Sequence, residues 1–113
     1  MRLTSGIWVA AYVRRAFVEG AFAAVVRRGA EEAGAIFIVV DRLDGTVDLY
    51  GPAPQTAFDD ERPTDRLFSR LGEAIDRLAL QQRLASEMRF DPDVWVVEIE
   101  DRGGRAFLDL APD

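Results

Sequence analysis

The chain has 113 residues, 49% hydrophobic and 30% charged, a balance that fits one globular domain with an apolar core. It contains no cysteine or histidine, and all 14 basic residues are arginine, which excludes thiol nucleophiles, imidazole bases, lysine Schiff bases and nearly all zinc sites. The net charge of −6 opposes non-specific binding to nucleic acid or to an anionic membrane. Catalysis would have to use carboxylates, hydroxyls or arginine with Mg²⁺ or Mn²⁺, and no cofactor is predicted.

The N-terminal region carries no targeting signal of the secretory type. Its apolar stretch from Ile7 to Val13 is interrupted by Arg14 and Arg15, and no apolar run approaches the roughly 18 residues that span a bilayer. We therefore expect a soluble, cytoplasmic protein that forms a single domain over residues 1–113.

The first half of the chain predicts one helix followed by three strands. Ser5 can cap a helix over residues 6–19, and Gly20 can end it. Strands are expected over residues 21–28, 35–40 and 46–50, with Asp44 and Gly45 forming the last turn. The links are short, so we expect these three strands to form an antiparallel meander.

The second half predicts a loop, a short strand, a second helix and a final strand. Residues 51–54 break the sheet and residues 55–65 form a polar loop, before a strand over 66–71 and a helix over 72–88. The last long strand covers 94–100, and residues 106–108 can add a short edge strand. The fold class is therefore α+β: a largely antiparallel sheet of four to six strands with two helices packed on it, both on one face.

The last long strand passes from apolar residues into acidic ones. Side chains alternate along a strand, so Trp95 shares one face with Val97, whereas Glu98 and Glu100 share the other. Asp41, at the end of another apolar strand, could join these two glutamates around a divalent cation if the strands were neighbours. The preferred interpretation is that the acids form the solvated end of a buried strand and face arginines across the sheet.

Two other groups of residues are candidates for binding. Arg14 and Arg15 on the first helix, with Arg27 and Arg28 on the first strand, could form an anion site, although pairing with nearby glutamates explains them as well. In the second helix, one apolar stripe is expected to face the sheet, and a second stripe lies nearly opposite. The second stripe could pack inside the domain or form the contact of a homodimer; it consists of Leu80, Leu84 and Met88.

Three blocks of the sequence resemble a known family. "SGIWVAAYVRR", "LDGTVDLYGPAP" and "FDPDVWVVEIEDR" are similar, in this order, to the DUF1491 family, a group of short alphaproteobacterial proteins of unknown function. The resemblance covers nearly the whole chain, and residues 59–71 match the family pattern least. It implies a small stand-alone cytoplasmic protein, and it implies no activity and no site residues.

Two functions from different classes follow from these observations. The favoured one is a non-catalytic interaction or binding module that forms a homodimer or binds another protein. The alternative is an Mg²⁺- or Mn²⁺-dependent hydrolase or nuclease that uses Asp41, Glu98 and Glu100.

Overall fold

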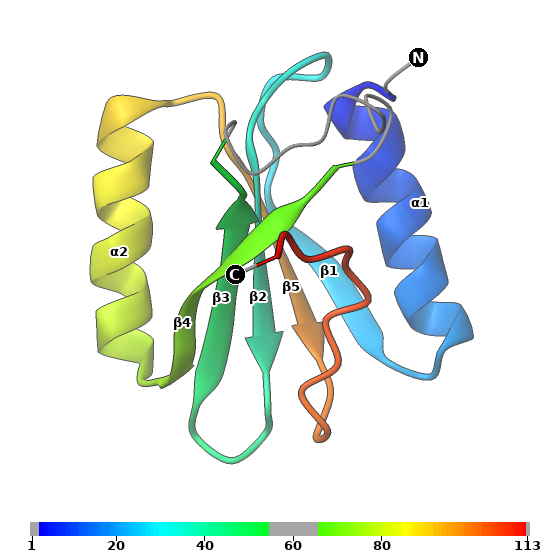
Figure 1. Ribbon diagram of the computed structural model, residues 1–113, viewed down its shortest axis with the longest axis vertical. Coiled ribbons are helices and arrows are strands. Elements are labelled where there is room, and N and C mark those ends of the chain that lie inside the picture. Colours follow the sequence, from blue (N-terminus) through cyan, green and yellow to red (C-terminus); the bar gives the residue numbers. More distant parts are fainter. Residues whose placement is uncertain (1–2, 55–65, 113) are drawn as a thin grey trace.

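Two helices lie on opposite faces of one five-stranded sheet in the computed structural model, which describes residues 3–54 and 66–112 (Figure 1). The predicted α+β class, with two helices and a sheet of four to six strands, is confirmed. The expected placement of both helices on one face is wrong, because apolar side chains cover both faces of the central strands and each face needs a cover. The elements in chain order are α1 Ser5–Val18, β1 Phe22–Arg27, β2 Ile36–Asp41, β3 Val47–Pro52, β4 Phe68–Ile75, α2 Arg77–Phe90 and β5 Trp95–Glu100.

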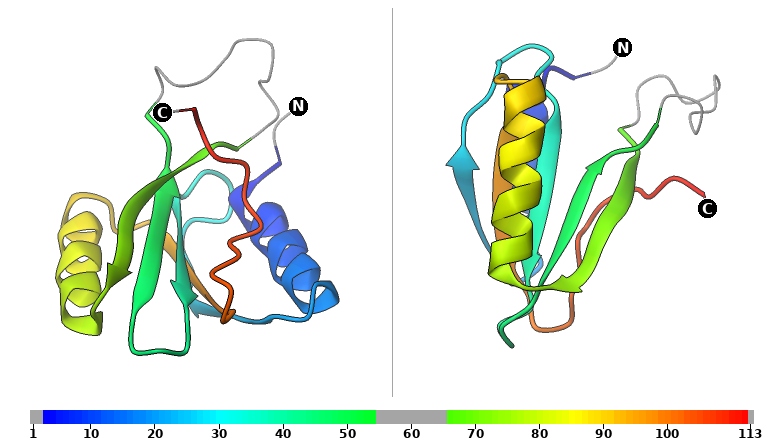
Figure 2. Two further views of the ribbon diagram at one scale, coloured as in Figure 1. Left: turned by 60° about the horizontal axis from the view of Figure 1, so that its bottom comes forward. Right: turned by 90° about the vertical axis from the view of Figure 1, so that its left-hand side faces the viewer.

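The order of the strands in the sheet is β1-β5-β2-β3-β4. The predicted meander is correct for β2 and β3, which pair antiparallel, but wrong for β1. The last strand, β5, lies between β1 and β2, antiparallel to β1 and parallel to β2. β1 and β4 are consequently the two edges of the sheet, and α2 crosses one face between β4 and β5 (Figure 2).

Each face of the sheet has its own apolar core. On one face, Val9, Tyr12 and Ala16 of α1 pack on β2 and β5 side chains that include Trp95, which is 1% exposed. On the other face, Leu80 of α2 packs on residues that include Phe37 and Val96. The alternation predicted for the last strand is therefore confirmed: Trp95, Val97 and Ile99 face α1, and Val94 and Val96 face α2.

The helix starts differ from the predicted positions. The Thr4 hydroxyl caps α1 by accepting from the Ile7 backbone, while Ser5 is buried and donates to the Gly34 carbonyl at 2.6 Å. α2 begins at Arg77, behind the Asp76 cap, because β4 continues through Ile75. The buried Asp48 carboxylate accepts from the Ala74 backbone at 2.7 Å and from Arg42, which holds this irregular end of β4 against β3.

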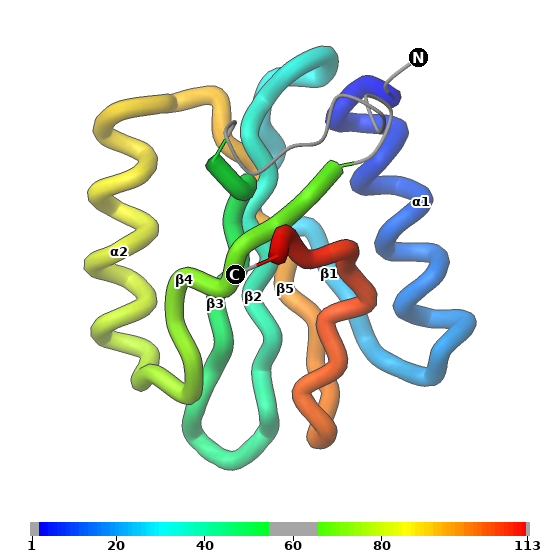
Figure 3. The backbone as a smooth tube through the Cα atoms, viewed as in Figure 1, coloured from blue at the N-terminus to red at the C-terminus, as the bar shows by residue number. Residues whose placement is uncertain are grey.

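The C-terminal segment crosses the sheet without forming the predicted strand over residues 106–108. Tyr12 donates to the Ala106 carbonyl at 2.7 Å, and Phe107 has a positive φ of 56°. An isolated bridge joins Leu110 to Phe68 at the β4 edge, and the C-terminal segment passes β4 in the tube view (Figure 3). The predicted loop over 55–65 lies outside the described residues. Within the described ranges, no helix has the length and apolar character needed to cross a bilayer.

Candidate interaction surface at the β1 edge

The carboxylates singled out in the sequence come together because β2 and β5 are neighbours. The two strands run parallel, and Asp41 pairs with Glu100 while Val39 pairs with Glu98. Asp41 and Glu98 therefore reach the α2 face at the same end of the sheet, where the strands leave the cover of the helix. The sequence analysis required the two strands to be neighbours for these carboxylates to meet, and β2 and β5 are neighbours.

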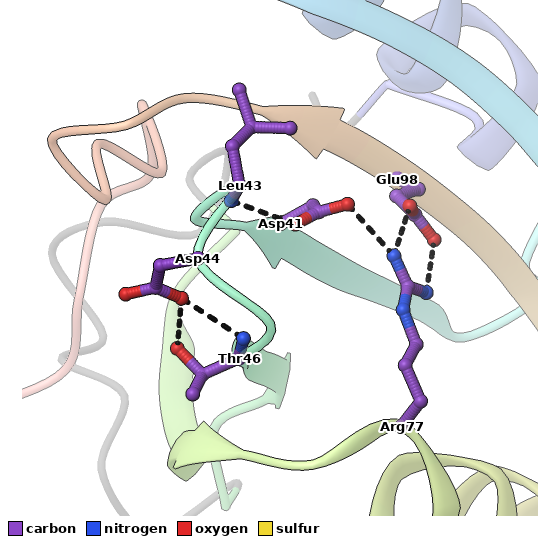
Figure 4. A network of polar contacts seen from close by, with 6 residues as sticks. All are labelled: Asp41, Leu43, Asp44, Thr46, Arg77 and Glu98. Atoms are coloured by element: carbon purple, nitrogen blue, oxygen red, sulfur yellow. Dashed lines mark hydrogen bonds and ion pairs between the residues drawn. The ribbon is translucent and has the colours of Figure 1, made fainter.

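Arg77, the first residue of α2, lies between these two carboxylates (Figure 4). Its two terminal nitrogens donate to both oxygens of Glu98, at 2.9 and 2.7 Å, and to Asp41 Oδ2 at 2.9 Å. The hydrogen bonds that Arg77 donates to Glu98 raise the pKa of Arg77 further above its ordinary value, so the guanidinium stays charged. Asp41 Oδ1 accepts from the Leu43 backbone at 2.8 Å, so all four carboxylate oxygens have a partner.

This arrangement uses the carboxylates differently from a metal site. The described residues include no group of three or more acidic, histidine or cysteine side chains placed to hold a metal ion. The guanidinium of Arg77 supplies the positive charge that a divalent cation would bring. The sequence did not single out Arg77 for this position, because it precedes Glu98 by 21 residues and meets it only through the crossover of α2.

Glu98 and Glu100 also border a small hollow that opens at the β1 edge. Its volume is about 150 Å³, and its other walls are Phe22, Ala24 and Val26 of β1. Phe22 pairs with Glu100 and Ala24 with Glu98 across the β1–β5 ladder, so apolar and acidic side chains lie next to each other on the α2 face. The hollow offers apolar walls to an aliphatic stem and the Glu100 carboxylate to a cationic end, while Arg77 already donates to both oxygens of Glu98.

β1 itself is an apolar edge strand with exposed side chains. Phe22 and Val26 are 54% and 62% exposed, and Val25 is 39% exposed. Phe17, at the end of α1, places its ring edge-on to that of Phe22, with centroids 5.8 Å apart. Among the described residues, β1 pairs with β5 alone, and it is the outermost strand on the side away from β4 (Figure 2). We name the set Phe17, Phe22, Ala24, Val25, Val26, Glu98 and Glu100 the β1 surface.

The opposite edge of the sheet is protected against pairing. β4 carries the charged and exposed Arg70 and Glu73, its pairing with β3 is shifted in two places, and Leu110 bridges to Phe68. Charges, bulges and covering segments are the usual devices that prevent edge strands from associating. β1 has a bulge after Val25 but no charged residue before Arg27. The β1 edge therefore carries fewer protective features than the β4 edge.

The predicted dimer stripe on α2 faces the sheet, which corrects the sequence interpretation. Leu80 is 3% exposed, and Leu84 and Met88 pack with it on the α2-side core. The sequence analysis expected the opposite stripe of the helix to face the sheet. Three residues of that stripe belong to β4 instead of α2: Leu71, Ala74 and Ile75. What remains of that stripe in α2 includes Leu78, which is 64% exposed. The homodimer itself stays a prediction.

The four candidate anion-binding arginines lie at different ends of two antiparallel elements. Arg28 is 3.5 Å from Glu31 and lies over the Trp95 ring, and Arg27 donates to the Pro92 carbonyl at 2.8 Å. Arg14 and Arg15 are exposed near the end of α1, which leads into the start of β1. Arg27 and Arg28 lie at the opposite end of β1 (Figure 1). An anion site shared by all four stays a prediction.

A larger hollow of about 430 Å³ lies elsewhere, near the start of α1. Its walls are mainly apolar or backbone groups, including Leu3, Gly34, Ile36 and Phe68. It presents few charged groups: its lining includes Glu32 and Arg66, and Arg66 donates to the Leu3 carbonyl at 2.8 Å. The β1 surface combines an open edge, apolar side chains and charge, and it is the stronger candidate site.

The comparisons with known proteins agree with one another. A family model described as "Protein of unknown function (DUF1491)" matches residues 3–109, and no curated protein matches the chain. The solution structure of protein Atu0922 from A. tumefaciens is 43% identical, with a TM-score of 0.85 over 100% of this chain and 98% of that one. A crystal structure of a DUF1491 family protein from Caulobacter crescentus CB15 is 42% identical, with a TM-score of 0.76 over 96% and 94%. Our chain therefore belongs to the DUF1491 family.

Proposed function

We propose that this protein is a non-catalytic interaction module that binds an extended protein segment along the β1 edge. The open edge of β1, with exposed Phe22 and Val26, is the observation that carries the proposal. A bound segment adds one strand to the sheet, its backbone pairs with β1, and its side chains meet the β1 surface on alternate positions. Affinity comes from the backbone ladder and apolar burial, while Glu100 favours segments that carry a basic residue.

The alternative, a metal-dependent hydrolase, finds less support in the same region. Such an enzyme needs carboxylates with free oxygens around the cation. The oxygens of Asp41 and Glu98 accept hydrogen bonds from Arg77 and Leu43 instead.

A selection from a random peptide library tests the proposal. The library displays eight-residue peptides and is selected against the full chain, and the amide resonances of the ¹⁵N-labelled chain locate each selected peptide. We expect shifts in β1 and β5, and loss of binding in Phe22→Ser/Val26→Ser. Leu110→Ser is the matched control, because Leu110 is 48% exposed at the opposite edge. Peptides that bind only elsewhere, or equally to the double variant, would contradict the proposal.

A further inference from the structure

We propose that the β1 surface is occupied by β1 of a second copy of this chain, paired antiparallel about a twofold axis. The inference rests on the proposed function and names its partner. The two sheets then form one continuous sheet across the dimer, and no second kind of protein is needed.

The faces of β1 define how the two copies align. A twofold axis perpendicular to the sheet keeps the α2 face of one copy on the same side as the α2 face of the other, so directly paired residues come from the same face. Phe22 and Ala24 lie on this face, and the bulge after Val25 brings Arg27 onto it as well, since Arg27 pairs with Val96. Aligning Ala24 with Ala24 at the axis therefore puts Phe22 of each copy opposite Arg27 of the other.

This alignment brings opposite charges together twice. Glu100 lies beside Phe22 in β5, at the start of β1, whereas Arg27 ends the strand. The backbones of Glu100 and of the other copy's Arg27 are two strand spacings apart, about 10 Å, which the two side chains can span together. In the dimer the Arg27 guanidinium exchanges the Pro92 carbonyl, to which it donates at 2.8 Å within one chain, for the hollow of the other copy. Its stem then lies along Phe22 and its guanidinium points towards Glu100. The neighbouring strands β1 and β5 of each copy thus supply both halves of a self-complementary contact.

Charge reversal with rescue tests this contact in the full chain. Sedimentation velocity over a range of concentrations should give a dimer, twice the 12.6 kDa of one chain. We expect Arg27→Glu and Glu100→Arg each to weaken dimerisation about tenfold or more, and the double variant Arg27→Glu/Glu100→Arg to restore it. Arg70→Glu on β4 is the control and should leave the dimer unchanged. Circular dichroism shows whether each variant is folded.

Cross-linking provides a second measurement that needs no charge variant. The chain has no cysteine. The thiol introduced by Ala24→Cys can therefore form a disulfide only with the same thiol of a second copy. At the axis the two sulfurs fall within disulfide reach, and mild oxidation should give a covalent dimer. Leu110→Cys, at the opposite edge, should stay mostly monomeric at the same concentration.

The outcomes separate this inference from the proposed function. A monomer at high micromolar concentration, or a dimer unaffected by both single reversals and by the position of the cysteine, overturns the twofold β1 pairing. If the monomer still captures library peptides on β1, the proposed function stands without the dimer. A chain that neither dimerises nor captures peptides there contradicts both.

Discussion

Trp95 anchors β5 through contacts of three kinds. Its ring is buried in the α1-side core, its indole nitrogen donates to the Ala30 carbonyl at 2.8 Å, and the Arg28 guanidinium lies 5.1 Å from the ring centroid. These contacts join the loop before β2 to the start of β5. The sequence prediction that Trp95 faces the core is confirmed by its burial.

Trp95→Ala should be among the most damaging single changes. Removing a buried aromatic side chain leaves a cavity and typically costs about 3–5 kcal/mol. The measurement is the free energy of unfolding from urea titration. Phe90→Ala serves as the control, because Phe90 is 88% exposed and its loss should change stability little. An unchanged midpoint for Trp95→Ala would contradict the assigned packing.

Asp101 makes the stability depend on pH. Hydrogen bonds from the Arg105 side chain lower the pKa of Asp101, against the opposing effect of burial. A lowered folded-state pKa stabilises the protein above the unfolded value of about 3.9, and this stabilisation is lost as the pH falls through the folded-state pKa. The carboxylate also accepts from the Arg105 backbone at 2.7 Å, so it organises the turn after β5.

Asp101→Asn should destabilise the protein at pH 7 by about 1–3 kcal/mol, the usual range for a hydrogen bond to a charged group. The difference from the wild type should shrink as the pH falls from about 4 through the lowered folded-state pKa, because protonation of the wild-type carboxyl then favours the unfolded state. Urea titrations at pH 7 and pH 3 measure both differences. An equal effect at the two pH values would show that the charge of Asp101 is not the cause.

At the scale of elements, the end of the β2–β5 pair meets the start of α2. Arg77 links the helix to both strands through Asp41 and Glu98, whose side chains are 21% and 23% exposed. Partly exposed pairs of this kind contribute modestly to stability. Their clearer effect is on ligand choice, since they place a guanidinium where a cation would otherwise bind.

We therefore expect the wild-type chain to have only a low affinity for Mg²⁺ and Mn²⁺. The oxygens of Asp41 and Glu98 are already used by Arg77 and Leu43. Isothermal titration calorimetry measures the affinity directly. Micromolar binding that disappears in Glu98→Gln would contradict this expectation and favour the hydrolase alternative.

The two sides of α2 should respond oppositely to truncation. Leu80 is 3% exposed and Leu78, two positions earlier, is 64% exposed. Leu80→Ala should cost about 2–5 kcal/mol, and Leu78→Ala should stay within about 0.5 kcal/mol of the wild type. Thermal unfolding of the two variants compares them in the same helix. Similar losses would mean that α2 is rotated relative to the sheet.

At the scale of the whole molecule, charge and edge pairing act against each other. Each copy carries a net charge of −6, which repels a second copy over long distances. In the proposed dimer the contact between Arg27 and Glu100 would attract, but complementary charges of this kind determine orientation more than affinity. Apolar burial along β1 would therefore have to provide most of the stability of the proposed dimer.

Salt should consequently strengthen the dimer over a moderate range. Raising NaCl from about 10 to 150 mM shortens the screening length from about 30 to 8 Å, which removes the long-range repulsion between copies. We expect the dimer dissociation constant from sedimentation to fall over this range. A dissociation constant that rises instead would show that the ion pairs dominate the contact.

Local patterns in the sequence determined the elements and the faces of the strands. Alternation assigned Trp95 and Val97 to one face and Glu98 to the other, because neighbouring side chains in a strand must point in opposite directions. The missing residue types excluded whole classes of chemistry, because no fold can supply an imidazole, a thiol or a side-chain amine that the chain lacks. The start of α2 was misplaced because residues 72–75 are compatible with a helix, and only pairing with β3 makes them a strand.

The tertiary structure alone decided which elements became neighbours. The position of β5 between β1 and β2 depends on contacts between residues far apart in the chain, which no local pattern encodes. That position brings Asp41, Glu98 and Arg77 together, and it leaves β1 as an edge with Phe22 and Val26 exposed. α2 has apolar residues on more than one side, so the side that meets the sheet was chosen by how β4 and β5 place the helix, and not by the helix sequence.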